Sequence, residues 1–289
     1  MSNVEVRYSN LDWLPVEFTT FSDGCETCEI PSYKFKPFHT YIPQDDIISA
    51  VRVNIVDCTR DLMRLLLVKD AIDAVQSDKP ELYLDYLPNA RADRRFKRGM
   101  PHPLKVTAKL INSCNFKTVY VDDTHSDVAE GLIDNIMIGQ QGCILRPYLR
   151  GIHKNFSEDF LLVAPDLGAA KKIYDVAEVL KHKDYVQGVK IRDTSTGEIV
   201  KCDILPHDIQ GKDLLMVDDI ADGGASFKYL ARKLKELGAA KVGLYVTHGI
   251  FSKGLETLKV DIDYICCDNL ICSYINRQSI SDFNNKVGE

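Results

Sequence analysis

The chain has 289 residues, of which 45% are hydrophobic and 27% charged, which is typical of folded globular proteins with room for two domains. The net charge of −6, from 36 basic and 42 acidic residues, argues against a general nucleic-acid-binding protein. No apolar run approaches the roughly 18 residues that span a bilayer, and the first residues lack the pattern of a secretory signal. We therefore expect a cytoplasmic protein with no nucleic-acid partner and no membrane attachment.

Short apolar runs alternate with helical segments along the chain. We expect strands at 51–56, 81–87 and 118–123, with helices at 61–75 and 104–113 between them. The pattern loosens at 135–147. A second series follows, with strands at 160–164, from 214 onward and at 241–246, and helices at 169–180 and 227–237. This alternation predicts an α/β protein with two domains, residues 1–143 and 144–289, each a mostly parallel sheet flanked by helices.

The nine cysteines are irregularly spaced, which is typical of reduced thiols in a cytosolic protein. Cys25 and Cys28 form one Cys-x-x-Cys pair, but no second pair or nearby His completes a zinc site. We therefore expect no metal or redox chemistry from this pair.

Residues 91–109 concentrate positive charge in an otherwise acidic chain. Turn-forming residues flank the first part of the segment, which predicts a loop. Such a run is usually a solvated surface, but fixed cations on a loop also suit a small polyanion such as ATP. The basic residues are Arg91, Arg94, Arg95, Lys97, Arg98, Lys105 and Lys109.

Residues capable of binding or catalysis follow three of the expected strands. Asp122, Asp123 and His125 end one strand, Asp166 ends another, and Asp218 with Asp219 ends a third. Ligands of open α/β sheets bind outside the carboxyl ends of the strands. Each residue alone is as well explained by a helix cap or a surface His, whereas all three ends together favour one shared site.

The segment 214–227 is the most informative in the chain. A buried strand ends in Asp218 and Asp219, and a Gly223-Gly224 turn leads into a helix. The carboxylates can accept hydrogen bonds from ribose hydroxyls or hold a hydrated Mg²⁺. The turn and the helix N-terminus favour a phosphate. The alternative is an ordinary turn with acidic residues near a helix N-terminus.

In combination, these motifs resemble those of the ribose-phosphate diphosphokinases, or phosphoribosyl-diphosphate (PRPP) synthetases, whose relatives include the type I phosphoribosyltransferases. The resemblance runs in order through most of the chain. It covers the segments 21–24, 90–95, 103–110, 123–125, 165–171, 190–192, 217–227 and 247–248.

The resemblance implies two tandem phosphoribosyltransferase-like domains and a function. The enzyme would transfer the β,γ-diphosphoryl group of ATP to the 1-hydroxyl of ribose 5-phosphate, giving PRPP and AMP, with Mg²⁺ as cofactor and as a homo-oligomer from dimer to hexamer. Implied catalytic residues are Lys190 and Arg192, on a polar and mobile segment. Implied ATP-binding residues are Phe21, Asp23, Arg91, Asp93 and Arg94. His125 and Asp166 would bind the metal. The ribose and its phosphate would contact Asp218, Asp219, Asp222, Gly223, Gly224, Ala225 and Ser226.

The chain departs from the family pattern at three places. Cys25 stands where the family has Glu, although Glu26 could substitute, and Ala92 stands where it has Gln. The phosphate loop keeps only one hydroxyl residue, Ser226, where the family has hydroxyls on both sides of its glycines. The smaller loop leaves open a 5′-extended ribose such as ADP-ribose, in NAD salvage, as the acceptor. A PRPP-consuming phosphoribosyltransferase and a catalytically silent regulator of synthetases are further alternatives.

Overall fold

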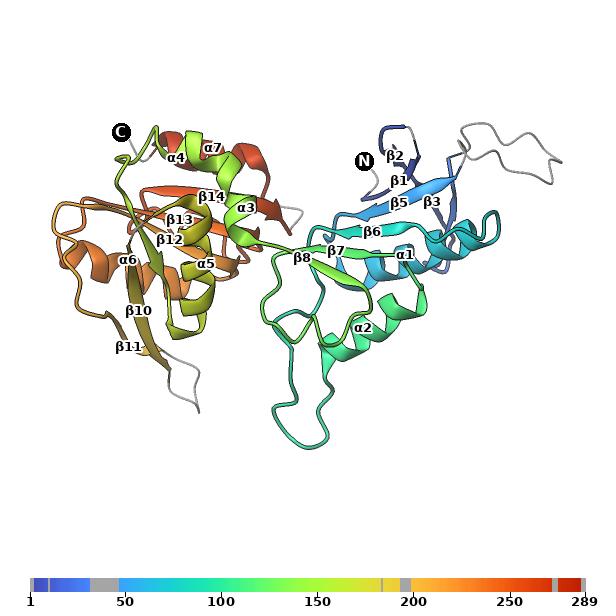
Figure 1. Ribbon diagram of the computed structural model, residues 1–289, viewed down its shortest axis with the longest axis horizontal. Coiled ribbons are helices and arrows are strands. Elements are labelled where there is room, and N and C mark those ends of the chain that lie inside the picture. Colours follow the sequence, from blue (N-terminus) through green and yellow to red (C-terminus); the bar gives the residue numbers. More distant parts are fainter. Residues whose placement is uncertain are drawn as a thin grey trace. The chain divides into compact units, whose positions relative to one another are not determined.

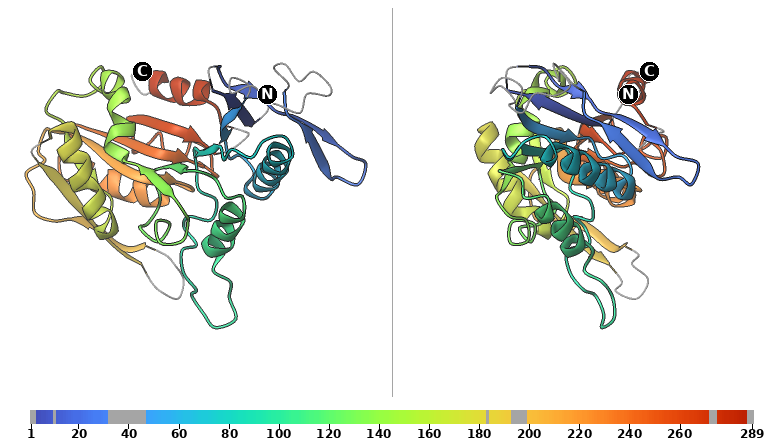
Figure 2. Two further views of the ribbon diagram at one scale, coloured as in Figure 1. Left: turned by 45° about the vertical axis from the view of Figure 1, so that its right-hand side comes forward. Right: turned by 90° about the vertical axis from the view of Figure 1, so that its right-hand side faces the viewer.

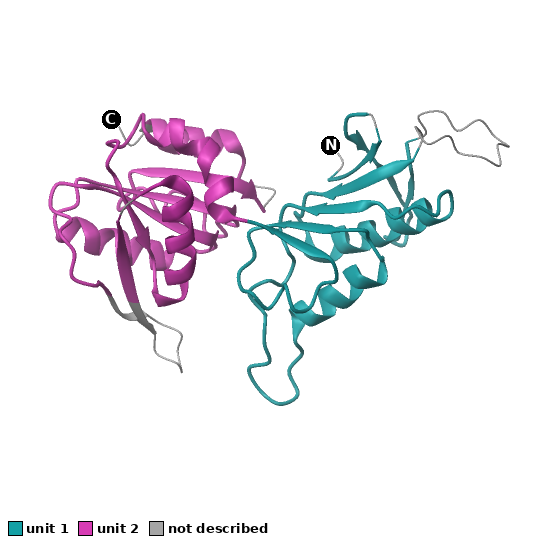
Figure 3. Ribbon diagram, in the orientation of Figure 1, with its two compact units in different colours: residues 1–139 teal, residues 140–289 magenta. Residues whose placement is uncertain are grey.

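The computed structural model describes residues 3–9, 11–31, 47–182, 184–192, 199–271 and 275–286, of which 190–192, 199–202 and 286 are described by their backbone alone. The chain forms two compact units, residues 1–139 and 140–289 (Figure 3). This division lies slightly before the expected one between 143 and 144. No helix of the described residues is long and apolar enough to cross a bilayer.

The N-terminal unit is built on a six-stranded sheet in the order β2-β1-β5-β6-β7-β8. Strands β5 to β8 run parallel, and β1 pairs antiparallel with β2 and β5. Helices α1 and α2 lie on the same face of this sheet (Figures 1 and 2), and β3 and β4 form a separate hairpin. The bounds are β1 Val4–Tyr8, β2 Leu14–Pro15, β3 Glu17–Thr20, β4 Glu26–Glu29, β5 Ile48–Val53, α1 Cys58–Asp73, β6 Glu81–Leu84, α2 Pro103–Ser113, β7 Val119–Asp122 and β8 Ile136–Gly139.

Helix α1 begins at Cys58, about one turn before the expected start at 61. The reason is Asp57, whose side chain accepts hydrogen bonds from the backbone N–H groups of Thr59 and Arg60 at 3.1 and 2.9 Å. This is the usual cap of a helix N-terminus. Apolar residues at helical spacing then face the core, namely Leu62, Leu65, Val68 and Ile72.

The C-terminal unit contains a second six-stranded sheet, in the order β11-β10-β9-β12-β13-β14. All its pairings are parallel except that of β10 with β11. The bounds are α3 Gln141–Leu145, η2 Arg146–Tyr148, α4 Leu149–Ile152, β9 Leu161–Ala164, η3 Leu167–Ala169, α5 Ala170–Leu180, β10 Tyr185–Arg192, β11 Ile199–Ile204, β12 Asp213–Ala221, α6 Ala225–Glu236, β13 Lys241–Gly249, β14 Tyr264–Leu270 and α7 Arg277–Lys286.

Helices cover both faces of this second sheet. Leu215 and Val217 of β12 belong to a buried cluster with residues of α3 and α5. Leu214 and Met216 belong to a different cluster, with residues of α6 and α7. Successive strand residues point to opposite faces, so a strand buried on both faces has a continuous apolar sequence. This explains the apolar run before Asp218.

Residues 135–147, where the sequence pattern loosens, include regular structure. Residues 136–139 form β8, which pairs in parallel with β7, and residues 141–145 form α3. None of the four residues of β8 is fully buried. Its apolar run, Ile136-Met137-Ile138, is short and lies between the turn-forming residues Asn135 and Gly139, so the local pattern did not predict a strand.

Strands β10 and β11 form a two-stranded arm at one edge of the C-terminal sheet. β10 pairs with β9 only through Tyr185, Val186 and Gln187, whereas its residues 188–192 pair with β11 alone. The backbone of Lys190 and Arg192 thus belongs to a strand of this arm and not to a loop. The alternating sequence of residues 185–192 is typical of a strand.

Candidate active site

The carboxyl edge of the C-terminal sheet carries three acidic side chains. Strands β9 and β12 are adjacent and parallel, so their carboxyl ends meet at the same edge. Asp166 follows β9, and Asp218 and Asp219 lie near the end of β12. The structure therefore gathers three carboxylates at the edge where ligands of open α/β sheets bind.

The electrostatics of this edge favour a cationic or hydroxyl-rich ligand. Burial raises the pKa of Asp218 well above its usual value, and the carboxylates of Asp219 and Asp166 raise it further. A positive charge is near, because Nζ of Lys172 lies 3.9 Å from the Asp219 carboxylate. Carboxylates that repel one another are stabilised by a cation or by hydroxyl donors, so the edge suits Mg²⁺ or vicinal ribose hydroxyls.

The side chains at the carboxylate edge indicate which kind of metal ion could bind there. In the described part of the chain, no group of three or more His, Cys, Asp or Glu side chains is placed to hold a metal ion. Structural zinc needs such a set, whereas Mg²⁺ keeps several waters and combines one or two carboxylates with substrate phosphates. The carboxylates at the sheet edge fit a magnesium ion brought with a phosphorylated substrate.

The turn after β12 is fixed by the segment that follows β13. The carbonyl oxygen of Ala221 accepts a hydrogen bond from the backbone N–H of Phe251 at 3.1 Å. The hydroxyl of Ser252 donates to Oδ1 of Asp222 at 2.5 Å. Gly224 has φ of +74° and is the N-cap of α6, whose first residue is Ala225. The turn therefore presents backbone N–H groups at a helix N-terminus next to the carboxylates.

Gln141, the first residue of α3, positions the end of β12 and was not predicted. Its buried side chain donates from Nε2 to the carbonyl oxygen of Asp218 at 2.7 Å and to Oγ1 of Thr247 at 3.1 Å. Thr247 is itself fully buried. No sequence signal marks a single glutamine as such a contact, because its partners lie far away in the chain.

In the N-terminal unit, Asp93 joins the basic loop to the end of β7. Asp93 is 7% exposed and accepts hydrogen bonds from Oγ of Ser126 at 2.8 Å and from Nε of Arg94 at 3.1 Å. Burial alone would raise the pKa of Asp93, but these bonds and the nearby charges of Arg94 and His125 hold it below its usual value. Asp93 therefore fixes the loop, and it brings residues 91–95 next to residues 122–126.

The residues of this unit that are expected to bind ATP phosphates or the metal are accessible. Arg91 and His125 are exposed, and the Arg94 side chain is 71% exposed, with its guanidinium 5.9 Å from the centre of the Phe96 ring. The exposed loop projects from the unit in Figure 1. The two arginines can reach an anion in solution, and His125 can reach a metal ion.

Phe21 and Asp23 lie at the tip of the β3–β4 hairpin. Phe21 is 54% exposed, and Asp23 accepts a hydrogen bond from the backbone N–H of Cys25 at 3.0 Å, which shapes the turn. Glu26 does not face the tip. Its carboxylate accepts two hydrogen bonds from Arg64 of α1, at 2.7 and 2.5 Å, and this pairing holds the pKa of Glu26 below its usual value. Glu26 therefore anchors the hairpin, and the suggestion that it replaces the missing family Glu is not supported.

The side chains of Lys190 and Arg192 lie outside the described residues, so their assignment remains a prediction from the sequence. Their backbone is given by β10. Gly188 of the same strand approaches the end of β9 so closely that an added Cβ would lie 2.6 Å from the carbonyl oxygen of Ala164.

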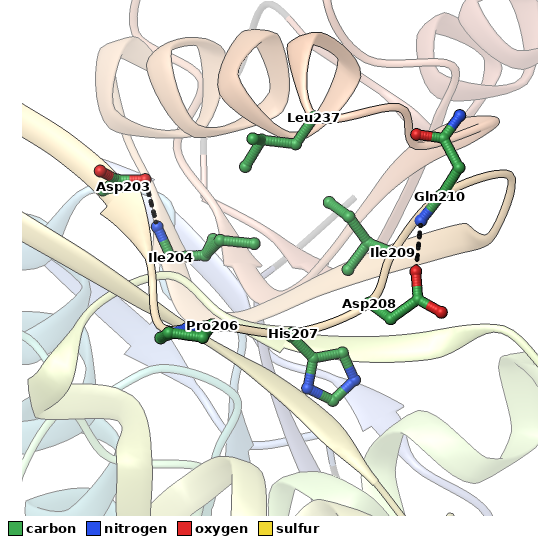
Figure 4. Close-up of a pocket in the computed structure, with 8 residues that line it drawn as sticks. All are labelled: Asp203, Ile204, Pro206, His207, Asp208, Ile209, Gln210 and Leu237. Atoms are coloured by element: carbon green, nitrogen blue, oxygen red, sulfur yellow. Dashed lines mark hydrogen bonds between the residues drawn. The ribbon is translucent and has the colours of Figure 1, made fainter.

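A separate pocket of about 350 Å³ lies near the amino end of β12, at the opposite end of the strand from the carboxylates (Figure 4). It is lined by the chain that precedes β12 and by Leu237, which follows α6. His207 in this pocket lies 3.2 Å from the Asp184 carboxylate. The pocket lies at the amino end of β12, and the strand runs five residues, about 17 Å at 3.3 Å per residue, from Asp213 to Asp218, so the pocket is not part of the carboxylate edge.

Comparisons with known proteins agree with this architecture. Residues 140–282 match the model of the phosphoribosyl transferase domain family. The ribose-phosphate pyrophosphokinase of Pyrococcus abyssi is 29% identical over 98% of this chain and 93% of its own. That of Thermococcus kodakarensis is 28% identical over 96% and 92%.

A solved structure shares the fold of both units. The phosphoribosylpyrophosphate synthetase of Mycobacterium smegmatis matches with a TM-score of 0.72 over 94% of this chain and 89% of its own, at 17% identity. The sequence relatives and the matched domain agree with this likeness in fold. The chain therefore belongs to the ribose-phosphate pyrophosphokinase family, with its phosphoribosyl transferase domain at residues 140–282.

Proposed function

We propose that the protein transfers the β,γ-diphosphoryl group of ATP to the 1-hydroxyl of ribose 5-phosphate, producing PRPP and AMP. The relatives are named for this reaction. The observation that carries the proposal is the group of Asp166, Asp218 and Asp219 at one sheet edge, next to the turn at 222–226. Carboxylates beside a turn of backbone N–H donors suit a ribose that carries a phosphate.

The C-terminal unit would bind the sugar phosphate. Asp218 and Asp219 would accept hydrogen bonds from the ribose hydroxyls, which relieves the repulsion that raises the pKa of Asp218. The turn from Asp222 to Ser226, through Gly223, Gly224 and Ala225, would hold the 5′-phosphate with its N–H groups.

The N-terminal unit would bind ATP. Arg91 and Arg94 would contact the triphosphate, and Phe21 and Asp23 the adenine. Asp93 would keep the arginine loop in place through Ser126 and Arg94. Fixed cations favour a polyphosphate because they need not be reorganised when it binds.

Lys190 and Arg192 would stabilise the negative charge that develops on the transferring group. Mg²⁺, when bound, would neutralise phosphate oxygens. The residues that we assign to magnesium binding are His125 in the N-terminal unit and Asp166 at the carboxylate edge of the C-terminal unit. The acceptor hydroxyl must also be oriented, and Asp218 and Asp219 would do this by fixing the neighbouring hydroxyls.

The names of the relatives favour ribose 5-phosphate over the alternatives considered from the sequence. A phosphoribosyltransferase would have no use for the arginine loop, and a silent regulator would have none for the carboxylate edge. An ADP-ribose acceptor shares the chemistry and is decided by the acceptor assay below. We further propose a cytoplasmic homo-oligomer, from dimer to hexamer, whose size light scattering measures.

The test is product analysis by mass spectrometry after incubation with ATP, Mg²⁺ and either ribose 5-phosphate or ADP-ribose. We expect AMP and PRPP with ribose 5-phosphate. Asp219→Asn should reduce AMP release strongly. Asp208→Asn, an exposed aspartate near the amino end of β12, should leave it unchanged. ADP as the sole nucleotide product would show that the enzyme is not a diphosphokinase.

A further inference from the structure

Lys253 lies against the turn that we assign to the substrate phosphate. A Cβ built on Gly223 would lie 3.6 Å from both Cδ and Cε of Lys253, so the methylene stem of the lysine runs alongside the backbone of Gly223. The ammonium is one bond beyond Cε. Lys253 is exposed, and no ion pair found among the described residues includes it.

The backbone next to Lys253 is held in place by other contacts. Phe251 is fully buried and its N–H donates to the carbonyl oxygen of Ala221. Ser252 donates its hydroxyl to Asp222. These bonds come from the two residues that precede Lys253, and they tie its segment to the turn. The lysine is therefore anchored beside the turn, and its charged end is able to adjust to a ligand.

The turn itself is short of positive charge. Asp222 contributes a carboxylate, and Ser226 is the only hydroxyl residue that follows the glycines. A phosphate dianion in the turn is repelled by Asp222 and attracted by backbone N–H groups. A lysine ammonium beside the turn compensates for the carboxylate, because a charged hydrogen bond to phosphate is stronger than a neutral one.

We propose that Lys253 is a specificity-determining residue for the sugar substrate, whose ammonium binds the 5′-phosphate from the side of Gly223. The inference rests on the proposed function, because it takes the turn at 222–226 as the phosphate site. Lys253 contacts the phosphate and not the diphosphoryl group in transfer. Its removal therefore weakens binding of the sugar phosphate and leaves the transfer step unchanged.

The experiment uses the full chain with three variants. Lys253→Met keeps the stem and removes the charge, and Lys253→Arg keeps the charge. Lys259→Met is the matched control, because Lys259 is in the same connection after β13 but pairs with Glu256 at 2.5 Å. We expect Lys253→Met to raise KM for ribose 5-phosphate about tenfold or more, the scale of one charged hydrogen bond, with kcat and KM for ATP within about twofold. Lys253→Arg should retain most of the affinity, and Lys259→Met all of it.

Calorimetric titration with ribose 5-phosphate and with unphosphorylated ribose, both without ATP, separates this inference from the proposed reaction. If the wild type binds ribose 5-phosphate but releases no AMP, the reaction is wrong, and weaker binding by Lys253→Met still supports the lysine. Unchanged affinity in Lys253→Met, an equal loss of affinity for ribose, or no binding by the wild type would each overturn the inference.

Discussion

Replacing Gly224 by alanine tests whether the phosphate turn depends on the conformation described above. Gly224 has φ of +74°, in the left-handed region where a side chain costs roughly 1–2 kcal/mol. The added Cβ would lie 2.6 Å from Cδ2 of Leu258, which is 1% exposed in the core of the C-terminal unit. Displacing such a side chain costs about 1–3 kcal/mol.

These costs act together, while alanine recovers about 0.4–1 kcal/mol by restricting the unfolded chain. We therefore expect Gly224→Ala to lower the free energy of unfolding by roughly 2–4 kcal/mol. For a unit of this size, that corresponds to a fall in Tm of roughly 5–15 °C. AMP release should fall as well, because Gly224 is the N-cap residue of α6 and shapes the turn that we assign to the substrate phosphate.

Gly223→Ala is the matched control. Gly223 does not have a positive φ, and its added Cβ would meet only the stem of Lys253 at an ordinary contact distance of 3.6 Å. Its Tm should stay within about 3 °C of the wild type. Scanning calorimetry of the full chain measures both variants. A Tm for Gly224→Ala close to that of the wild type, or an equal loss in Gly223→Ala, would refute the argument from backbone conformation.

Three further predictions concern other parts of the molecule. Lys190→Ala and Arg192→Ala should each lower turnover by at least about 100-fold with little change in Tm; wild-type turnover in both would show that the catalytic pair lies elsewhere. His125→Ala should raise the Mg²⁺ concentration needed for half-maximal activity, and an unchanged magnesium titration would remove His125 from the site. Burial, with the nearby Asp122 charge, raises the pKa of Asp85 to about 7. The protonated carboxyl therefore stabilises the fold at low pH, and this contribution is lost as pH rises through about 7. The stability of Asp85→Asn relative to the wild type should increase from pH 5 to 8 in urea titrations, and a difference that does not depend on pH would contradict the assignment.

The sequence predicted best those helices and strands that are buried on one face or on both faces. Helix α2 (Pro103–Ser113) and strand β12 (Asp213–Ala221) have apolar residues at the spacing that their burial requires. Strand β8 was missed because its short apolar run, residues 136–138, lies between the turn-forming residues Asn135 and Gly139. The arm of β10 and β11 was missed because the polar residues near its end were taken as a loop.

The site was predicted only as far as single segments allow. The acidic strand ends and the glycine turn can be found from local sequence, since parallel strands bring their carboxyl ends to one edge. The contacts of Gln141 with Thr247 and of Glu26 with Arg64 could not be, because they join segments far apart in the chain. Nor does the sequence place the stem of Lys253 beside Gly223.

The pairing of β10 has a mechanical consequence for the transfer step. Its first part belongs to the sheet, but residues 188–192 are tied to β11 alone, and an isolated two-stranded ribbon is marginally stable. We expect the ribbon to pivot at Gly188, the residue at which it leaves the sheet, where a side chain does not fit because an added Cβ would lie 2.6 Å from the carbonyl oxygen of Ala164. We expect the stiffness of this pivot to determine how often Lys190 and Arg192 reach the substrate. A dependence of kcat on solvent viscosity would measure it, and the speed of the enzyme would then depend on a glycine that touches neither substrate.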